Sequence, residues 1–370
     1  MTPRASFWRR YFLAGVVFQS VLIGGGYATG RELVEYFLAS RPAAAFTGLL
    51  LVAAIWSVIC AAAFAHAHAA RTYDYRTFYR SLLGRGWVLY EIAYIALMVL
   101  VLAVLGAAAG EIGSQFLGVT PAVGTAVFAL LVAVVCALGL RVVELAFSVW
   151  GPLIYPVFGV LAWLAITQWP GTIGTALATP AQPGNEWVMK GLAYAGYNLA
   201  VIASVLPFAR HFTTTREAVV SGLLCGPLAI IPGMLLITAL LTQYPEIVGA
   251  PVPVTVVLTG LELPWLTLMV SCVIFGTLVQ TGFGIIGGLV ERLLQTEGVV
   301  QRFPERWLRA VVPVVLVVVS VYLGERLGLI ALIAQGYGTV AWVILLLTVV
   351  PLAGVFLRVL WRRWRSAPRG

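Results

Sequence analysis

Three consecutive glycines lie within an apolar run near the start of the chain, and a charged pair follows them closely. The stretch from Gly24 to Glu32 reads GGGYATGRE. Each glycine costs about 1 kcal/mol relative to alanine inside a helix, so four glycines in this short stretch predict an interruption. Peptide groups freed in an apolar segment must face protein, water, an ion or a solute. The stretch therefore predicts a binding site.

A second interruption is predicted in an apolar run just past the middle of the chain, where the sequence reads YAGYN. Paired interruptions at corresponding positions of two halves are the best sequence indication of a central solute site. The alternatives are close helix packing for the glycines and interhelical hydrogen bonding for the second run. The predicted solute contacts are Gly24, Gly25, Gly26, Tyr27, Ala28, Thr29 and Glu32 in the first run and Tyr194, Gly196, Tyr197 and Asn198 in the second.

The peptide groups on the two sides of the first interruption should have opposite polarity. The amides of Tyr27, Ala28 and Thr29 would begin a half-helix, whose positive end attracts a carboxylate or phosphate. The carbonyls of Leu22 and Ile23 would end the preceding half-helix and suit a cation. One interruption could thus hold both ends of a zwitterion, or an anion together with its coupling ion.

Two charged residues and two threonines extend this predicted site. An ionisable side chain inside a membrane costs at least about 2.5 kcal/mol, so such residues usually mark a pathway. We expect Glu32 to bind an amine or carry a proton and Arg31 to form an outer gate, the alternative being a local ion pair at the surface. Thr277 and Thr281 share one helix face and could complete a sodium shell, although threonine in such helices often bonds its own backbone.

Motifs for bond-making chemistry are not found in the sequence. It contains no HExxH motif and no CxxC pair, and its only histidines are His66, His68 and His211. We therefore predict that the protein is not an enzyme, that it has no cofactor, and that it binds no metal other than a coupling Na⁺; H⁺ is the alternative coupling ion.

The composition determines which elements position these residues. Hydrophobic residues make up 61% of the 370 residues and charged residues only 10%, with a mean hydropathy of +0.99. A soluble domain of this size needs a more charged surface. Long unbroken apolar runs indicate membrane-spanning helices rather than the short alternating strands of a barrel. We predict an all-α polytopic membrane protein with ten spans, at about 11–37, 43–67, 88–117, 121–140, 145–169, 187–209, 217–243, 264–290, 304–324 and 338–360.

The basic residues support this even number of spans. Of the 23 lysines and arginines, 19 fall at the two termini or in every second loop. This positive-inside bias predicts a multi-pass protein of the cell inner membrane with both termini in the cytoplasm. The net charge of +9 therefore reflects topology and contact with anionic lipids rather than nucleic-acid binding.

The ten spans divide into two sets of five. We predict a single transmembrane domain over 1–370, with a first repeat at about 8–169 and a second at about 186–362. Because five is odd, the second set must enter the membrane in the opposite orientation. An inverted repeat is the common architecture of secondary transporters.

Three motifs in the sequence resemble those of bacterial YkvI-type membrane proteins: GGGYATGRELVEYF, YAGYNLAVIASVLPF and IAQGYGTVAWVILLLTVVPL. The resemblance covers nearly the whole chain, and this family is distantly similar to the amino acid–polyamine–organocation and neurotransmitter-sodium-symporter transporters. It implies a LeuT-like fold in which broken helices 1 and 6 enclose the substrate. It also implies that sodium, where used, lies between carbonyls of span 1 and hydroxyls of span 8. Span 8 departs from the sodium-symporter pattern because it has no adjacent Thr-Ser pair at mid-membrane; Ser271 is followed by Cys272.

These observations together predict a function. We expect a secondary active transporter of a small polar solute, an amino acid or a related zwitterion, that works by alternating access. The alternative is a ligand-binding sensor or receptor subunit with a transporter-like fold. The expected partners are the small-molecule substrate and membrane lipids, and the sequence predicts no oligomeric state.

Overall fold

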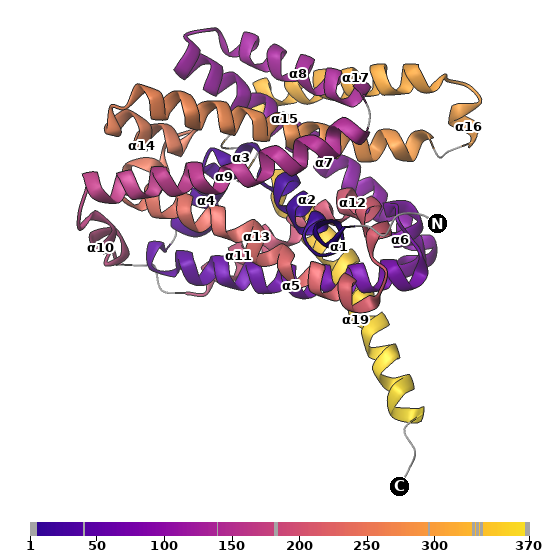
Figure 1. Ribbon diagram of the computed structural model, residues 1–370. Coiled ribbons are helices and arrows are strands. Elements are labelled where there is room, and N and C mark those ends of the chain that lie inside the picture. Colours follow the sequence, from indigo (N-terminus) through magenta and orange to yellow (C-terminus); the bar gives the residue numbers. More distant parts are fainter. Residues whose placement is uncertain are drawn as a thin grey trace.

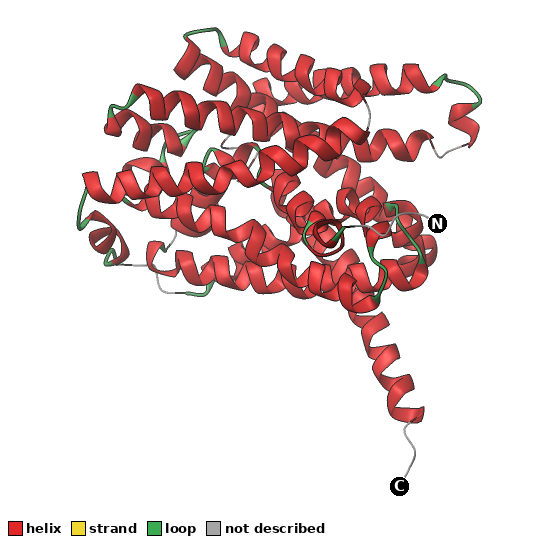
Figure 2. Cartoon of the chain, viewed as in Figure 1, coloured by secondary structure: helices red, strands yellow, loops and turns green. Residues whose placement is uncertain are grey.

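The computed structural model describes residues 6–39, 41–138, 140–180, 184–294, 297–327, 330, 333 and 336–366. Over these residues the chain is almost entirely helical and contains no strand (Figure 2). The long helices run roughly parallel or antiparallel to one another in an elongated bundle (Figure 1). The predicted all-α class is therefore confirmed.

A helix lies at each of the ten predicted spans. Six of the helices are long and apolar enough to cross a membrane, and three shorter helices are also apolar. The first span comprises α2 (Leu13–Leu22), α3 (Gly25–Ala28), α4 (Arg31–Leu33) and η1 (Val34–Leu38), and the sixth comprises α11 (Glu186–Asn198), η4 (Leu199–Val201), α12 (Ile202–Val205) and η5 (Leu206–His211). The other spans are α5 (Ala45–Ala70), α7 (Trp87–Leu117), α8 (Pro121–Leu138), α9 (Leu140–Gln168), α13 (Thr215–Leu241), α15 (Pro264–Leu294), α17 (Glu305–Leu327) and α19 (Tyr337–Ser366).

Short helices connect these spans. On the side of the N-terminus lie α1 (Phe7–Tyr11), α6 (Tyr75–Leu83), η3 (Gly84–Gly86) and α16 (Glu297–Val300). At the opposite end lie η2 (Pro42–Ala44), α10 (Thr172–Leu177), η6 (Glu246–Val248) and α14 (Pro253–Leu261). The bundle therefore has two distinct ends, and the connectors alternate between them as expected for a chain that crosses a membrane repeatedly.

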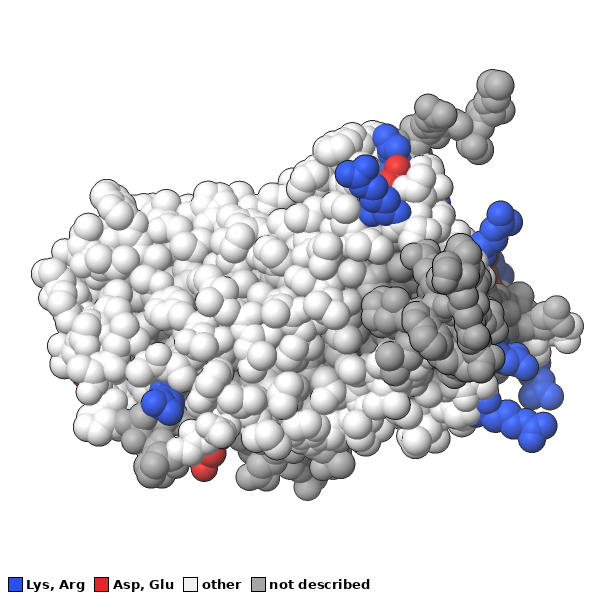
Figure 3. Space-filling view, turned by 90° about the horizontal axis from the view of Figure 1, so that it is seen from below, with Lys and Arg blue, Asp and Glu red and all other residues white. Residues whose placement is uncertain are grey.

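The surface of the bundle agrees with a membrane location. Figure 3 shows a face that is almost free of charge, with most of its Lys and Arg side chains toward the end that carries the N-terminus. Large apolar side chains are exposed on several helices, where a soluble protein would be polar. They include Leu50, Val58, Leu130, Trp163 and Val318. The fold is that of a multi-pass membrane protein.

Contacts between the helices follow the same pattern in the two halves. In the first half α2 packs on α9, and in the second half α11 packs on α19. When the two halves are exchanged, the packing of α9 on α15 corresponds to the packing of α19 on α7. The packing of α7 on α17 likewise corresponds to the packing of α15 on α8. This correspondence is expected of the five-plus-five architecture. The repeat boundaries at 8–169 and 186–362 stay a prediction.

Candidate functional site

The first span is interrupted twice in the middle of the bundle. Helix α2 ends at Leu22, and Gly24 is extended, with φ −101° and ψ −155°. One turn of helix follows, and the chain then turns at Gly30, whose φ of +84° is in the left-handed region that glycine adopts without strain. The predicted break at the glycine cluster is thus present in the structure.

The sixth span is interrupted more mildly and slightly later than predicted. Tyr194–Asn198 belongs to the regular helix α11, and the chain narrows to a 3-10 helix only at Leu199–Val201. The side-chain amide of Asn198 donates to the carbonyl of Tyr194 in the same helix (2.9 Å). Gly196 serves close packing instead of unwinding, since a Cβ there would lie 2.7 Å from the Ala341 carbonyl of α19.

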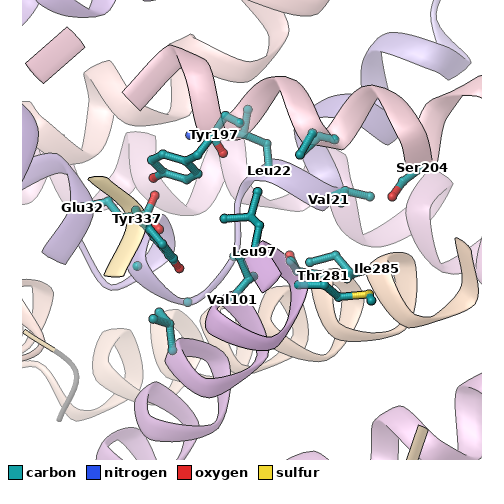
Figure 4. Close-up of a pocket in the computed structure, with 18 of the residues that line it drawn as sticks. Val21, Leu22, Glu32, Leu97, Val101, Tyr197, Ser204, Thr281, Ile285 and Tyr337 are labelled. Atoms are coloured by element: carbon teal, nitrogen blue, oxygen red, sulfur yellow. The ribbon is translucent and has the colours of Figure 1, made fainter. Parts of the chain in front are cut away.

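A cavity of about 50 Å³ lies beside both interruptions. One wall comes from the first and sixth spans, a second from α7 and α15, and Tyr337 of α19 completes the enclosure. Figure 4 shows Glu32, Tyr197 and Tyr337 together at one end of the cavity and Ser204, Thr281 and Ile285 toward the other. Eight of the predicted site residues line it: Leu22, Gly24, Gly25, Gly26, Glu32, Tyr197, Asn198 and Thr281.

Glu32 is the charged residue of this cavity. Its side chain is buried, with only 6% of the residue exposed, and within the described part of the chain it forms no ion pair. The carboxylate folds back over the helix break, because a Cβ added at Gly26 would overlap its oxygen Oε1. The Tyr197 hydroxyl is directed toward this carboxylate but does not make a hydrogen bond of ordinary geometry. A buried carboxylate without a cation is costly, so it needs a proton or a bound cation.

A group of four tyrosines lies at the Glu32 end of the cavity, and two of them, Tyr197 and Tyr337, line it. The ring centroids of Tyr197 and Tyr337 are 4.5 Å apart, and those of Tyr194 and Tyr197 are 5.6 Å apart. Tyr36 packs on both Tyr194 and Tyr197. We name Tyr36, Tyr194, Tyr197 and Tyr337 the tyrosine cluster. Its aromatic faces and hydroxyl groups make this end of the cavity polar without adding positive charge.

At the other end of the cavity, α15 approaches the end of α2. The Thr281 hydroxyl lies 3.4 Å from the carbonyl oxygens of both Ser20 and Ile23. The Leu22 carbonyl instead accepts from the Gly24 amide, and the Thr277 hydroxyl donates to the Ile274 carbonyl in its own helix (2.6 Å). Three oxygens therefore lie near one another, which is part of the oxygen shell that a hard cation takes. Over the described residues no group of three His, Cys, Asp or Glu could hold a metal ion.

Several predicted solute contacts face away from the cavity. The Tyr27 hydroxyl donates to the Ala229 carbonyl of α13 (2.7 Å), and the Thr29 hydroxyl donates to the Gly25 carbonyl (2.6 Å). Tyr194 packs against Trp56 behind the cavity wall, and Ala28 is buried without lining the cavity. The second bend at Gly30 explains the difference, because it carries Glu32 back toward the cavity while Tyr27 reaches α13 and Thr29 bonds its own turn.

Arg31 points in the opposite direction to its neighbour Glu32. Its guanidinium donates to the carbonyls of Val248 (2.7 Å) and Ala250 (3.2 Å), in the connector after α13. It also pairs with Glu35 at 2.9 Å, and Lys190 donates to the Glu35 carbonyl (3.1 Å). Arg31 is 2% exposed, and these contacts hold it inside the end of the bundle opposite the N-terminus. This position suits the predicted gate, which stays a prediction.

The sequence reasoning missed the wall that α7 provides and the residues at the far end of the cavity. Apolar side chains of α7 do not differ in type from those that face lipid, so no pattern singled them out. Tyr94 and Ser204 are buried with hydroxyls that face each other, a signal that only the structure gives. The missed residues are Val21, Tyr94, Leu97, Met98, Val101, Val104, Ala200, Val201, Ser204, Ile285 and Tyr337.

Comparisons with known proteins bear on the fold. No protein family matches the sequence, and no curated protein matches it. Solved structures do match. A Na⁺-coupled sialic acid symporter in a substrate-bound, outward-open state has a TM-score of 0.68 at 14% identity, covering 91% of this chain and 78% of that one. MhsT in complex with L-phenylalanine has a TM-score of 0.68 at 15% identity, covering 94% of this chain and 88% of that one.

A third similar structure is a manganese transporter from Eremococcus coleocola, with a TM-score of 0.60 at 16% identity, covering 95% of this chain and 80% of that one. The structures that resemble this chain are LeuT-fold transporters rather than enzymes. The chain therefore has the LeuT fold, as predicted. Membership of the YkvI-type family stays a prediction, because such low identity establishes the fold alone.

Proposed function

We propose that the protein is a secondary active transporter of a small polar solute that carries an amino group. The observation that carries this proposal is the buried Glu32 carboxylate, which faces the cavity and forms no ion pair among the described residues. An amino acid or related zwitterion, the class predicted from the sequence, meets this description, and so does an amine without a carboxylate. The similar fold of the sialic acid symporter and the manganese transporter supports the transport role.

The position of the cavity supports alternating access. It lies between one group of helices, the first and sixth spans, and a second group that includes α7 and α15. In the first group, α5 and α13 pack along each other and accompany the first and sixth spans. We expect spans 1, 2, 6 and 7 to rock as a unit against spans 3, 4, 8 and 9. The site would then open to each side in turn while its residues stay together.

The coupling ion is Na⁺ or H⁺ in this proposal, and each has a place at the cavity. Thr281 with the carbonyls of Ser20 and Ile23 offers oxygen ligands for Na⁺. Glu32 is the group that would carry H⁺. The sialic acid symporter of similar fold is coupled to Na⁺.

The orientation follows from the distribution of charge. We place the protein in the cell inner membrane, with the arginine-rich end that carries the N-terminus in the cytoplasm. Arg31 and its contacts at Val248 and Ala250 then lie on the outer side of the cavity. Lipids would cover the apolar surface between the two ends.

Uptake by proteoliposomes tests the proposal. Purified protein is first screened by thermal shift against amino acids and amines, since a ligand at 100 times its Kd stabilises by about 2.7 kcal/mol. Radiolabelled hits are then offered to proteoliposomes with an imposed Na⁺ or pH gradient. A transporter accumulates the solute above its external concentration, and accumulation collapses when the gradient is removed.

The same assay separates the alternative of a sensor or receptor subunit. A receptor with this fold would show saturable binding of the hit in detergent and no accumulation under either gradient. That result would refute the transport proposal and leave the binding site in place.

A further inference from the structure

We infer that the cavity selects a small ammonium cation and discriminates against the amino acid that carries an additional carboxylate. This inference rests on the proposed function, narrows its amino-group solutes to amines, and departs from the amino acid or zwitterion that the sequence predicted. Three observations carry it: the charges on the cavity wall, the place that the Glu32 carboxylate occupies, and the tyrosine cluster around it.

Over the part of the chain that the structure describes, the cavity wall has a single acidic side chain and no basic side chain to offset its charge when it is ionised. Of the described residues that line it, Glu32 is the one with a charged side chain, and none is Lys, Arg or His. The nearest arginine in sequence, Arg31, is committed to Val248, Ala250 and Glu35 on the other side of the chain. A zwitterion would bring its carboxylate into this wall without meeting a basic side chain. A cation would supply the charge that the buried carboxylate lacks.

The helix break is the place where a carboxylate was expected, and the protein's own carboxylate is already there. Glu32 lies over Gly26 so closely that no Cβ fits between them. A solute carboxylate at the break would be placed beside Glu32, and two carboxylates at one site repel each other strongly in a low-dielectric interior. The Glu32 carboxylate therefore lies at the break and beside the cavity, where it would bind the solute's positive charge.

The tyrosine cluster suits an ammonium group. Cations are attracted to aromatic faces within about 6 Å of the ring centroid, and tyrosine is among the favoured rings. Tyr197 and Tyr337 lie next to Glu32 at one end of the cavity (Figure 4). The Tyr197 hydroxyl is directed toward the Glu32 carboxylate, and the Tyr194 hydroxyl is buried, so the cluster also brings polar groups near the carboxylate. Apolar residues such as Leu97 and Val101 form the adjoining wall.

The size of the cavity limits the cation. One water needs about 10–15 Å³ of such space, so 50 Å³ corresponds to roughly three to five waters. In this conformation the cavity therefore admits an amine of a few heavy atoms. Larger amines require the wall of α7 to move away from the first span.

The experiment compares matched compounds on the wild-type protein. We would measure the Kd of three series by calorimetry in detergent: ethylamine, alaninamide and alanine; isoamylamine, leucinamide and leucine; and phenethylamine, phenylalaninamide and phenylalanine. Within a series the side chain is constant, and the amide keeps the bulk of the carboxyl group without its charge. We expect the amine and the amide of at least one series to bind about tenfold or more tightly than the amino acid.

Two outcomes of this comparison would overturn the inference. One is an amino acid that binds as tightly as its amine and amide in every series that binds. The other is a protein that binds none of the amines. An amino acid weaker than both its amine and its amide shows that charge, rather than bulk, is rejected.

A variant tests the role of Glu32 directly. Glu32→Gln should weaken amine binding by at least about tenfold and remove the preference over the amino acid, because the charge partner is lost. Glu186→Gln, which neutralises an exposed carboxylate outside the cavity, is the matched control and should change neither. Unchanged amine affinity in a folded Glu32→Gln protein would contradict the inference, and the wild-type series decides the matter if that variant does not fold.

Failure of this inference and failure of the transport proposal give different results. Amines that bind with the expected preference but are not accumulated by proteoliposomes would support the site and refute transport. Accumulation of another solute, with which the amines do not compete, would support transport and refute the ammonium class.

Discussion

The first and sixth spans cross the middle of the molecule beside the same cavity, yet their interruptions differ. The first span loses its helix at Ile23 and Gly24 and again at Gly30. The sixth keeps its α-helix to Asn198 and only narrows to a 3-10 helix over the next three residues. Three adjacent glycines remove the side-chain packing that would hold a helix straight, whereas a single glycine between two tyrosines does not.

Because of this difference, the two spans contribute different groups to the site. The first span presents backbone at Gly24, Gly25 and Gly26 and a single side chain, Glu32, that folds over it. The sixth presents side chains, Tyr197 and Asn198, from a helix whose own hydrogen bonds are largely kept. We therefore expect substitutions to have larger effects in the first span, where the backbone path itself forms the site.

The largest effect is expected for Gly25→Leu. A Cβ at this position already lies 3.2 Å from the Cα of Leu105 and 3.4 Å from the Cβ of Ala108, so a leucine must push the first span away from α7. Uptake into proteoliposomes should fall by at least about 100-fold, equal to about 2.7 kcal/mol. The matched control is Gly159→Leu, because a Cβ at Gly159 meets open space.

Expression and monodispersity of the two leucine variants must be compared with uptake. Normal expression of both proteins with uptake lost only in Gly25→Leu supports the site. Unchanged uptake by Gly25→Leu would show that the first break is not part of it.

A second, smaller effect is expected where the broken end of α2 meets α15. Thr281→Val removes the hydroxyl that lies near the Ser20 and Ile23 carbonyls, so stimulation of uptake by Na⁺ should fall about tenfold if Na⁺ is the coupling ion. Thr281→Ser should restore it. Thr277→Val should have the smaller effect, because that hydroxyl bonds the Ile274 carbonyl of its own helix.

The measurement is the initial rate of uptake at several Na⁺ concentrations and a fixed pH. Equal losses in both valine variants would indicate that Thr277 also belongs to the ion site, as the sequence predicted. No Na⁺ stimulation in the wild-type protein would favour H⁺ as the coupling ion.

The sequence predicted the parts of this architecture that depend on composition and on glycine. Apolar runs locate the ten spans, and the glycine cluster locates the first break. It also predicted that Thr277 and Thr281 share a face toward the end of the first half-helix; the Thr281 hydroxyl lies 3.4 Å from the Ile23 carbonyl, whereas Thr277 bonds its own helix. The direction of each side chain beyond the break could not be predicted, since a second bend, at Gly30, separates Glu32 from Tyr27.

The cavity wall that α7 forms could not be predicted from the sequence, for a different reason. Leu97, Met98 and Val101 are apolar in an apolar helix, and the residues of α7 that face lipid are apolar as well. Tyr337 lies far along the chain and reaches the site only because α19 packs on α11. Residues whose role depends on which helix lies beside them require the packed structure.

A third effect, on stability, distinguishes the second bend of the first span. Gly30→Ala forces alanine into the left-handed region, at a cost of about 1–2 kcal/mol. Its Cβ would also lie 2.9 Å from a methyl group of Leu240. Thermal unfolding in detergent should show a lower Tm for this variant. Gly174→Ala, at a position where a Cβ meets open space, should not lower it. An unchanged Tm in Gly30→Ala would mean that the bend is not held as the structure has it.

The smallest effect is expected for Asn198→Ala in the sixth span. Asn198 lines the cavity, but its amide donates to the Tyr194 carbonyl of the same helix, and the helix does not depend on that extra bond. We expect the KM for uptake to rise by no more than about fivefold, about 1 kcal/mol, with kcat retained, since one neutral hydrogen bond contributes about that much. Kinetics of uptake over a range of solute concentrations measure both constants. A loss as large as that of Gly25→Leu would show that the sixth span supplies more than side chains, and the contrast between the two helices would then disappear.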